Sequence, residues 1–244
     1  MTDALPKRGP TLAGFLVLGS FWGAWAAVLP SVQQATGASK GALGVAMLFV
    51  SVGSIPAMFL LAAPAVDRFG ARAVAIGFLG AAAFVVEGGT ESWSALFLER
   101  QLHAHPAVSG LGPGIFGASM ALGRFSGQAL HRFSDRLLLG GGAALSAVGC
   151  CIVAAAPNAP VGLVGFALAG AGISLTAPIV FGIAGRRPDA GSAVATVTTI
   201  GYLGLLVGPP LVGGVAQATN LRVSFLALAV IAAAVAATTT RLRV

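Results

Sequence analysis

The chain has 244 residues, of which 57% are hydrophobic and only 9% are charged, and its mean hydropathy is +0.92. Soluble domains carry roughly a quarter of their residues as charged side chains, so this composition excludes an ordinary soluble protein. The formal net charge of +7 does not indicate nucleic-acid binding, because the basic residues lie in short segments between apolar stretches. We therefore expect an integral membrane protein whose main partner is the lipid bilayer, and no nucleic-acid partner.

The apolar residues form stretches of about 20 residues, the length at which an α-helix crosses a hydrocarbon layer roughly 30 Å thick. Short alternating segments typical of a β-barrel are absent from the sequence. Proline and glycine mark the breaks between the stretches. We predict an all-α polytopic transmembrane bundle of about eight spans: Leu12–Leu29, Leu43–Val66, Arg72–Trp93, Val108–Leu130, Leu137–Ala156, Val161–Ala184, Gly191–Gln217 and Arg222–Thr240.

The distribution of basic residues predicts the orientation of these spans. With the N-terminus inside, the inner segments hold 11 of the 14 lysines and arginines, and the outer segments hold Lys40, Arg100 and Arg222. Positive residues are enriched in cytoplasmic segments, so we expect an even number of spans with both termini cytoplasmic in a bacterial inner membrane. The first apolar run is long for a signal peptide and further spans follow, so it is read as an uncleaved helix.

Three segments resemble one known family. Residues 65–72, Ala-Val-Asp-Arg-Phe-Gly-Ala-Arg, resemble the signature loop of the major facilitator superfamily, and residues 123–133 look like a degenerate second copy with Gln128 in place of an acid. Residues 201–213 are similar to the family's penultimate helix. The resemblance implies two cytoplasmic gating loops, built from Asp67, Arg68, Gly70 and Arg72 in the first copy and from Gly123 and Arg124 in the second. In the penultimate helix it implies close helix packing at Gly201, Gly204, Gly208 and Pro209.

Residues 87–95 look like the end of the family's seventh helix, in the branch that includes fucose-permease-like and uncharacterised inner-membrane members. The chain would then pass from the second family helix almost directly into the seventh. This implies an internal deletion of several first-half helices. We expect residues 1–71 to be a two-span remnant of the first half and residues 72–244 to form the second half, with six spans of which the first is a hybrid.

Candidate residues of a substrate or proton path follow from polar or aromatic side chains inside spans. Glu87 is the strongest, because an acid in a membrane is costly. The alternative is a hydrated structural residue near an outer interface marked by Trp93. Further candidates are Trp22, Trp25, Tyr202 and Thr198. A threonine in a membrane more often bonds its own helix backbone, and a tryptophan can face lipid.

The sequence offers no nucleophile–base pair, no cofactor motif in its required context and no metal-ligand spacing. Glu99, His103 and His105 lie close together, but a metal site also needs supporting geometry. The adjacent Cys150 and Cys151 lie in an apolar run and are read as packing residues. We therefore expect neither an enzyme nor a cofactor- or metal-binding protein.

The resemblance implies a secondary active transporter that moves a small solute by alternating access between two helix bundles, driven by protons. Two remnant spans cannot easily oppose six, so activity is expected to be impaired unless a homodimer supplies the missing wall. The alternative is a non-transporting membrane helix bundle that serves as a remnant, scaffold or partner subunit. The substrate and the direction of transport do not follow from the fold.

Overall fold

The computed structural model describes residues 28–52, 55–130, 132–188 and 190–239. Within these ranges the chain is helical apart from short connections, and no strand occurs in them. A helical segment at residues 28–36 comes first. The helices that follow are α2 (Lys40–Val52), α3 (Ile55–Leu102), α4 (Pro106–Ser109), α5 (Leu111–Leu130), α6 (Asp135–Ala155), α7 (Ala159–Ile173), α8 (Thr176–Gly185), α9 (Ala190–Ala218) and α10 (Leu221–Thr239).

Four segments of the described chain are long and apolar enough to cross a membrane: α6, the consecutive pair α7 and α8, α9 and α10. They coincide with the last four predicted spans, so the predicted all-α transmembrane bundle is confirmed. The predicted number of about eight spans is too high for the described residues. The predicted first span lies almost wholly outside them, and the next two are divided differently between α2 and the much longer α3.

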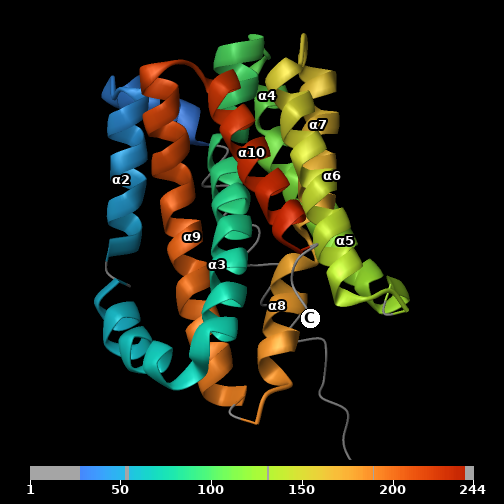
Figure 1. Ribbon diagram of the computed structural model, residues 1–244. Coiled ribbons are helices and arrows are strands. Elements are labelled where there is room, and N and C mark those ends of the chain that lie inside the picture. The colour runs from blue at the N-terminus through green and yellow to red at the C-terminus, as the bar shows by residue number, and fades with distance from the viewer. Residues whose placement is uncertain (1–27, 53–54, 131, 189, 240–244) are drawn as a thin grey trace, which may run out of the picture.

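Helix α3 contradicts the first predicted loop. The backbone is helical through Asp67, Arg68, Gly70 and Arg72, which were expected to form a gating loop between two spans. No proline interrupts this stretch, and alanine and arginine favour helix, so nothing local forces a turn. In the described residues only Gly37 and His103 have positive φ. Figure 1 shows the first part of α3 curving at the lower end of the bundle before the second part rises beside α9.

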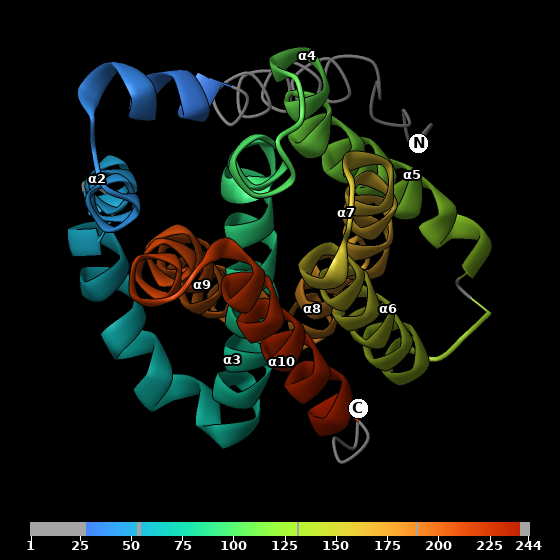
Figure 2. The ribbon, with the colours of Figure 1, turned by 90° about the horizontal axis from the view of Figure 1, so that it is seen from above.

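The second part of α3 lies at the centre of the bundle (Figure 2). Helix α9 packs along it and α2 packs on the outer side of α9. On the other side α5, α6 and α7 pack against one another, and α10 contacts α6, α3 and α9. The described helices therefore form two groups, α2–α3–α9 and α5–α6–α7, with α10 joining them.

Glycines allow close backbone contact within each group. A Cβ atom at Gly204 of α9 would collide with the Ala81 carbonyl oxygen of α3, and one at Gly208 would collide with the Val85 carbonyl oxygen. Gly142 of α6 and Gly172 of α7 approach each other in the same way. Small residues permit such approach in a membrane, where the hydrophobic effect does not drive helices together. Each group is therefore held by backbone-to-backbone packing.

Aromatic side chains close one end of the bundle. Phe97 of α3, Phe166 of α7 and Phe225 of α10 are fully buried, with ring centroids 5.0–6.1 Å apart in edge-on arrangements. Such pairs contribute beyond their buried area. Trp93 lies one turn before Phe97 and is also fully buried, and its indole Nε1 donates to the Pro209 carbonyl oxygen at 3.0 Å. Trp93 therefore packs inside the bundle and does not face lipid, while its position at a membrane interface stays a prediction.

Candidate functional site

An ion pair between α3 and α5 joins the two groups of helices. The Arg124 guanidinium of α5 donates from Nη2 to Glu87 Oε1 of α3 at 3.4 Å. The Glu87 side chain is 14% exposed and that of Arg124 is 41% exposed. The pair is thus partly accessible on the α5 side. It bridges two helices that make few other contacts, whereas α3 and α9 touch along much of their length.

The depth of the pair follows from helix geometry. Glu87 lies about 15 residues before the end of α3, or roughly 22 Å at 1.5 Å per residue. Arg124 lies about 13 residues after the start of α5, or roughly 20 Å from the same end of the bundle. A hydrocarbon layer is roughly 30 Å thick, so both charges are far from the membrane surface at that end. An ionisable residue at such a depth is a functional candidate.

The same arginine contacts a break between α7 and α8. Ser174 and Leu175 form a turn between these helices, and Pro178 follows in the first turn of α8. Because proline has no N–H group, the carbonyl four residues earlier, that of Ser174, loses its helical partner. Arg124 Nε donates to this Ser174 oxygen at 3.3 Å. One guanidinium therefore holds a carboxylate on α3 and a freed carbonyl at the α7–α8 break.

Other polar groups surround the pair. Glu91 follows Glu87 by one helical turn and is partly buried. The buried Thr90 hydroxyl, on the same helix as Glu87, lies beside the Cys150 thiol of α6. Together with Arg124 and Ser174, these residues form what we call the central polar cluster: Glu87, Thr90, Glu91, Arg124 and Ser174.

The prediction of a second gating loop is wrong, because the backbone is helical there. Gly123 and Arg124 lie inside α5, which continues to Leu130. A Cβ atom at Gly123 would collide with the Ser174 side chain, so this glycine lets α5 approach the α7–α8 break. The sequence alone predicts Arg124 as part of a gating loop. It could not connect Arg124 with Glu87, because the two are far apart in sequence and lie on helices whose facing sides were unknown.

The other candidate path residues lie apart from this pair. Tyr202 of α9 is half-exposed, and its ring stacks on that of Phe84 with centroids 6.3 Å apart. The Thr198 hydroxyl donates to the Val194 carbonyl of its own helix at 2.7 Å. Within the described helices, neither residue forms a hydrogen bond with Glu87 or Arg124. Trp22 and Trp25 lie outside the described residues, as do the side chains of the first predicted loop.

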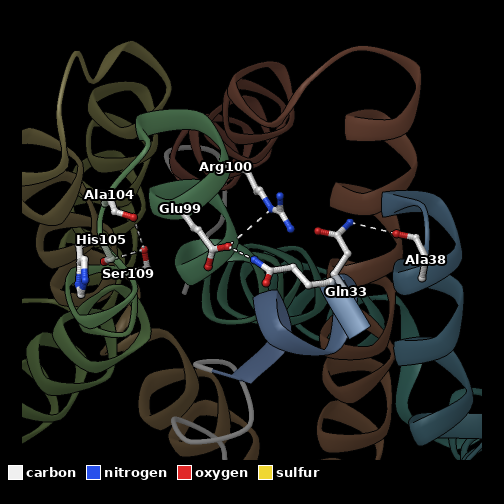
Figure 3. A network of polar contacts seen from close by, with 8 residues as sticks. Gln33, Ala38, Glu99, Arg100, Ala104, His105 and Ser109 are labelled. Atoms are coloured by element: carbon white, nitrogen blue, oxygen red, sulfur yellow. Dashed lines mark hydrogen bonds and ion pairs between the residues drawn. The ribbon is translucent and has the colours of Figure 1, made fainter. Parts of the chain in front are cut away.

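A second polar network lies at the end of α3 (Figure 3). Glu99 Oε1 accepts from Gln34 Nε2 at 2.8 Å and lies 3.7 Å from Arg100 Nε. Nearby, His105 Nδ1 accepts from the Ala107 backbone N–H and thereby caps α4. The described residues contain no group of His, Cys, Asp and Glu arranged to hold a metal ion. This network attaches the helical segment 28–36 to the end of α3.

Residues 88–243 match the family model of the Major Facilitator Superfamily. The chain belongs to this superfamily. It is 38% identical over 165 residues to an uncharacterised MFS-type transporter of Yersinia pestis, a match that covers 66% of this chain and 43% of the relative. It is 32% identical over 148 residues to the membrane protein MosC of Rhizobium meliloti, covering 59% and 36% of the two chains. An uncharacterised transporter of Sinorhizobium fredii is 27% identical over 164 residues, covering 66% and 44%.

The superfamily member described here is thus a multi-pass membrane protein that matches less than half the length of each of these relatives. Two of these relatives are named as transporters, which agrees with the predicted transporter class. The assignment to a fucose-permease-like branch stays a prediction. The matched region begins beside Glu87 and contains the Arg124 and Ser174 partners of the central polar cluster.

Proposed function

We propose that this chain is a secondary active transporter of a small solute, in which the central polar cluster forms part of the solute or proton path. The observation that carries the proposal is the Glu87–Arg124 ion pair, which lies roughly 20 Å from the end of the bundle where α3 ends and α5 begins. Charges at such a depth are expensive unless they are paired or hydrated, and proteins that keep them generally use them. Glycine contacts hold each group of helices together internally, whereas this pair connects α3 of one group to α5 of the other.

The arrangement of the helices favours alternating access. Backbone contacts hold α3 to α9 in one packed unit and α6 to α7 in the other, and a polar bridge joins α3 to α5, which also meet where Gly112 faces the Ser94 backbone. The bridge is reversible, since both partners can be hydrated when the units separate. At one end of the bundle the buried rings of Phe97, Phe166 and Phe225 close the space between the units. Such a construction opens on one side while it is shut on the other.

Proton coupling is the part of the proposal that involves Glu87 directly. A neutral Glu87 no longer attracts Arg124 as an anion does, so proton binding would weaken the bridge between α3 and α5. Arg124 would keep its bond to the Ser174 carbonyl, and α5 and α7 would stay together. Proton binding would thus loosen α3 from α5 within one chain, while the rocking motion itself would take place between this chain and its second copy.

The overall organisation is proposed as follows. Residues 1–71 are a two-span remnant of the first half of the transporter, and residues 72–244 form the second half. Both termini face the cytoplasm of a bacterial cell and the chain lies in its inner membrane. A second copy of the chain supplies the opposing wall, so the active unit is a homodimer. A non-transporting helix bundle is the outcome that the following experiment would reveal.

The proposal is tested by access to position 87 from both faces of the membrane. In a Cys150→Ala/Cys151→Ala background, Glu87→Cys should react with a membrane-impermeant thiol reagent applied to either face. Ala83→Cys, on the same helix and fully buried, is the matched control and should stay unlabelled. Labelling of position 87 from one face only, or from neither, in folded protein would exclude alternating access through this site.

Transport itself is measured after reconstitution with labelled sugars and cationic drugs, with and without a pH gradient. For any solute that accumulates, Glu87→Gln should reduce gradient-driven uptake about tenfold or more, within the range expected for loss of a positioned proton-transfer group. Glu99→Gln, at the end of α3, is the control and should leave uptake nearly unchanged. Equal gradient-driven uptake by Glu87→Gln and the unmodified chain would exclude the coupling role of Glu87.

A further inference from the structure

A cavity opens between the start of α6 and the end of α10, far from the central polar cluster in sequence and on different helices. Its volume is about 500 Å³, and its lining is mostly apolar. The lining residues are Ser134, Arg136, Leu137, Gly140, Gly141, Ala144, Ala236, Ala237 and Thr239. Figure 2 shows α6 and α10 side by side at the edge of the bundle. The transporter activity proposed above makes no use of this space.

Small side chains create the cavity. Gly140 forms part of its floor, where a Cβ atom would meet the Thr239 hydroxyl, so α6 and α10 come close there. Gly141, the next residue, has open space where a Cβ atom would lie. The backbone of α6 is thus bare on the side that faces the cavity. Any larger residue at Gly141 would fill space that the glycine leaves free.

The cavity continues into the lipid-facing surface of both helices. On α6 the exposed face runs from Leu137 through Gly141 to Leu145 and Val148. On α10 it includes the exposed Leu226 and Val230. Apolar side chains exposed along two adjacent membrane helices contact acyl chains. The cavity therefore lies where an acyl chain would run, at one end of the hydrocarbon layer.

The charge at its mouth determines which lipid fits. Arg136 lines the cavity and is exposed, and within the described chain no carboxylate forms an ion pair with it. The neighbouring Asp135 is paired with Arg186, so its charge is compensated. Arg132, four residues earlier, is also exposed. A cation at the end of an apolar groove matches the phosphate of a lipid whose acyl chain lies in the groove.

We propose that this cavity is a binding site for an anionic phospholipid, with an acyl chain against Gly141 and Ala144 and the headgroup at Arg136. The lipid would join α6 to α10, the helix that contacts both packed units. A lipid at this position would stabilise the junction between the units from the membrane side. The proposal does not depend on the transported solute or on the central polar cluster.

The test is lipid retention by the full chain purified in mild detergent, with phosphatidylglycerol and phosphatidylcholine added in equal amounts and the bound lipid measured by native mass spectrometry. The unmodified chain should retain phosphatidylglycerol preferentially. Gly141→Leu should reduce that retention about tenfold, equivalent to about 1.4 kcal/mol. Gly214→Leu on α9 is the matched control, because Gly214 also has open space at its Cβ position, and it should retain lipid normally.

The headgroup contact is tested separately. Arg136→Gln should lower the preference for phosphatidylglycerol about fivefold, as expected for the loss of one arginine near an anionic headgroup. Arg100→Gln, at the α3 end of the bundle, should not change it. Equal retention of both lipids by the unmodified chain would overturn the proposal. Equal effects of Gly141→Leu and Gly214→Leu on lipid retention would also overturn it. A change from dimer to monomer in Gly141→Leu, without a change in bound lipid, would overturn it as well, because a second copy of the chain would then occupy the groove.

Discussion

The contact of α3 with α9 and its contact with α5 are built on different principles. Between α3 and α9 the backbones touch, because Gly204 and Gly208 place no side chain between the helices. Between α3 and α5 a glycine, Gly112, faces the Ser94 backbone at one point, and the charged side chains of Glu87 and Arg124 bridge the two helices at another. Dispersion contacts between backbones are lost once the helices move apart. A charged pair can exchange its partner for water, so it permits two arrangements.

This difference indicates which parts of the molecule move together. Helices joined through glycine contacts behave as one body, since neither can shift without collision or loss of packing. Helices joined through an ion pair can separate if another group satisfies the charges. Glycine contacts hold α9 to α3 and α7 to α6, and the charged pair lies between α3 and α5, where the two units meet. The following predictions test this distinction, from the largest expected effect to the smallest.

The strongest test of the α3–α9 contact is Gly204→Leu. A Cβ atom at this position collides with the Ala81 carbonyl oxygen, a backbone atom that cannot move aside alone. We expect a loss of about 3 kcal/mol or more of folding free energy, at the upper end for overpacking. The measurement is thermal unfolding in detergent. Gly214→Leu on the same helix is the control, and equal melting temperatures for the two variants would contradict backbone contact at Gly204.

The polar bridge is tested by Arg124→Gln. This change leaves the Glu87 carboxylate and the Ser174 carbonyl without the guanidinium, and we expect a loss of about 1–3 kcal/mol. Pro178→Ala would give the Ser174 carbonyl a backbone N–H partner four residues later. In a double-mutant cycle on thermal or denaturant unfolding, Pro178→Ala should therefore recover about 1 kcal/mol of the loss. Strict additivity would show that Arg124 does not support the α7–α8 break.

The smallest effect is expected for Trp93→Phe. The ring volume at this buried position is largely preserved, but the bond from Nε1 to the Pro209 carbonyl is lost. A net loss of about 1 kcal/mol follows from one intramolecular hydrogen bond. It is measured as a shift of the melting temperature in the same detergent. A loss as large as that of Gly204→Leu would mean that this hydrogen bond, and not glycine packing, dominates the α3–α9 contact.

The sequence predicted the second half of the bundle well. The segment Pro157-Asn158-Ala159-Pro160 was read as a break, and α6 ends and α7 begins there, with the Asn158 side chain capping α7. Length and hydropathy suffice for such helices, because a membrane imposes one span length and requires every backbone group to be bonded within the helix. The same reasoning failed for α3, where a charged stretch resembling a loop motif is helical.

The candidate site could be found only in part. Glu87 was identified because a single acid in an apolar stretch is unusual and costly. Its partner was not identified, because Arg124 lies near the end of a predicted span and was expected to belong to a gating loop. Ser174 and Pro178 carry a further signal in the sequence. Because proline has no N–H group, the carbonyl four residues earlier, that of Ser174, lacks its helical partner and needs another donor. A sequence reports which groups lack partners, but not which distant side chain provides one.

The amino-acid sequence by itself determined that this chain lies in the membrane as a bundle of helices, because its apolar stretches are too long and too poor in charge for water. Tertiary structure alone decided that Arg124 meets Glu87 and the Ser174 carbonyl, and that glycines bring α9 against α3. Hydropathy is a property of each segment. Contacts depend on the relative rotation of helices, which packing fixes only when all of them are assembled.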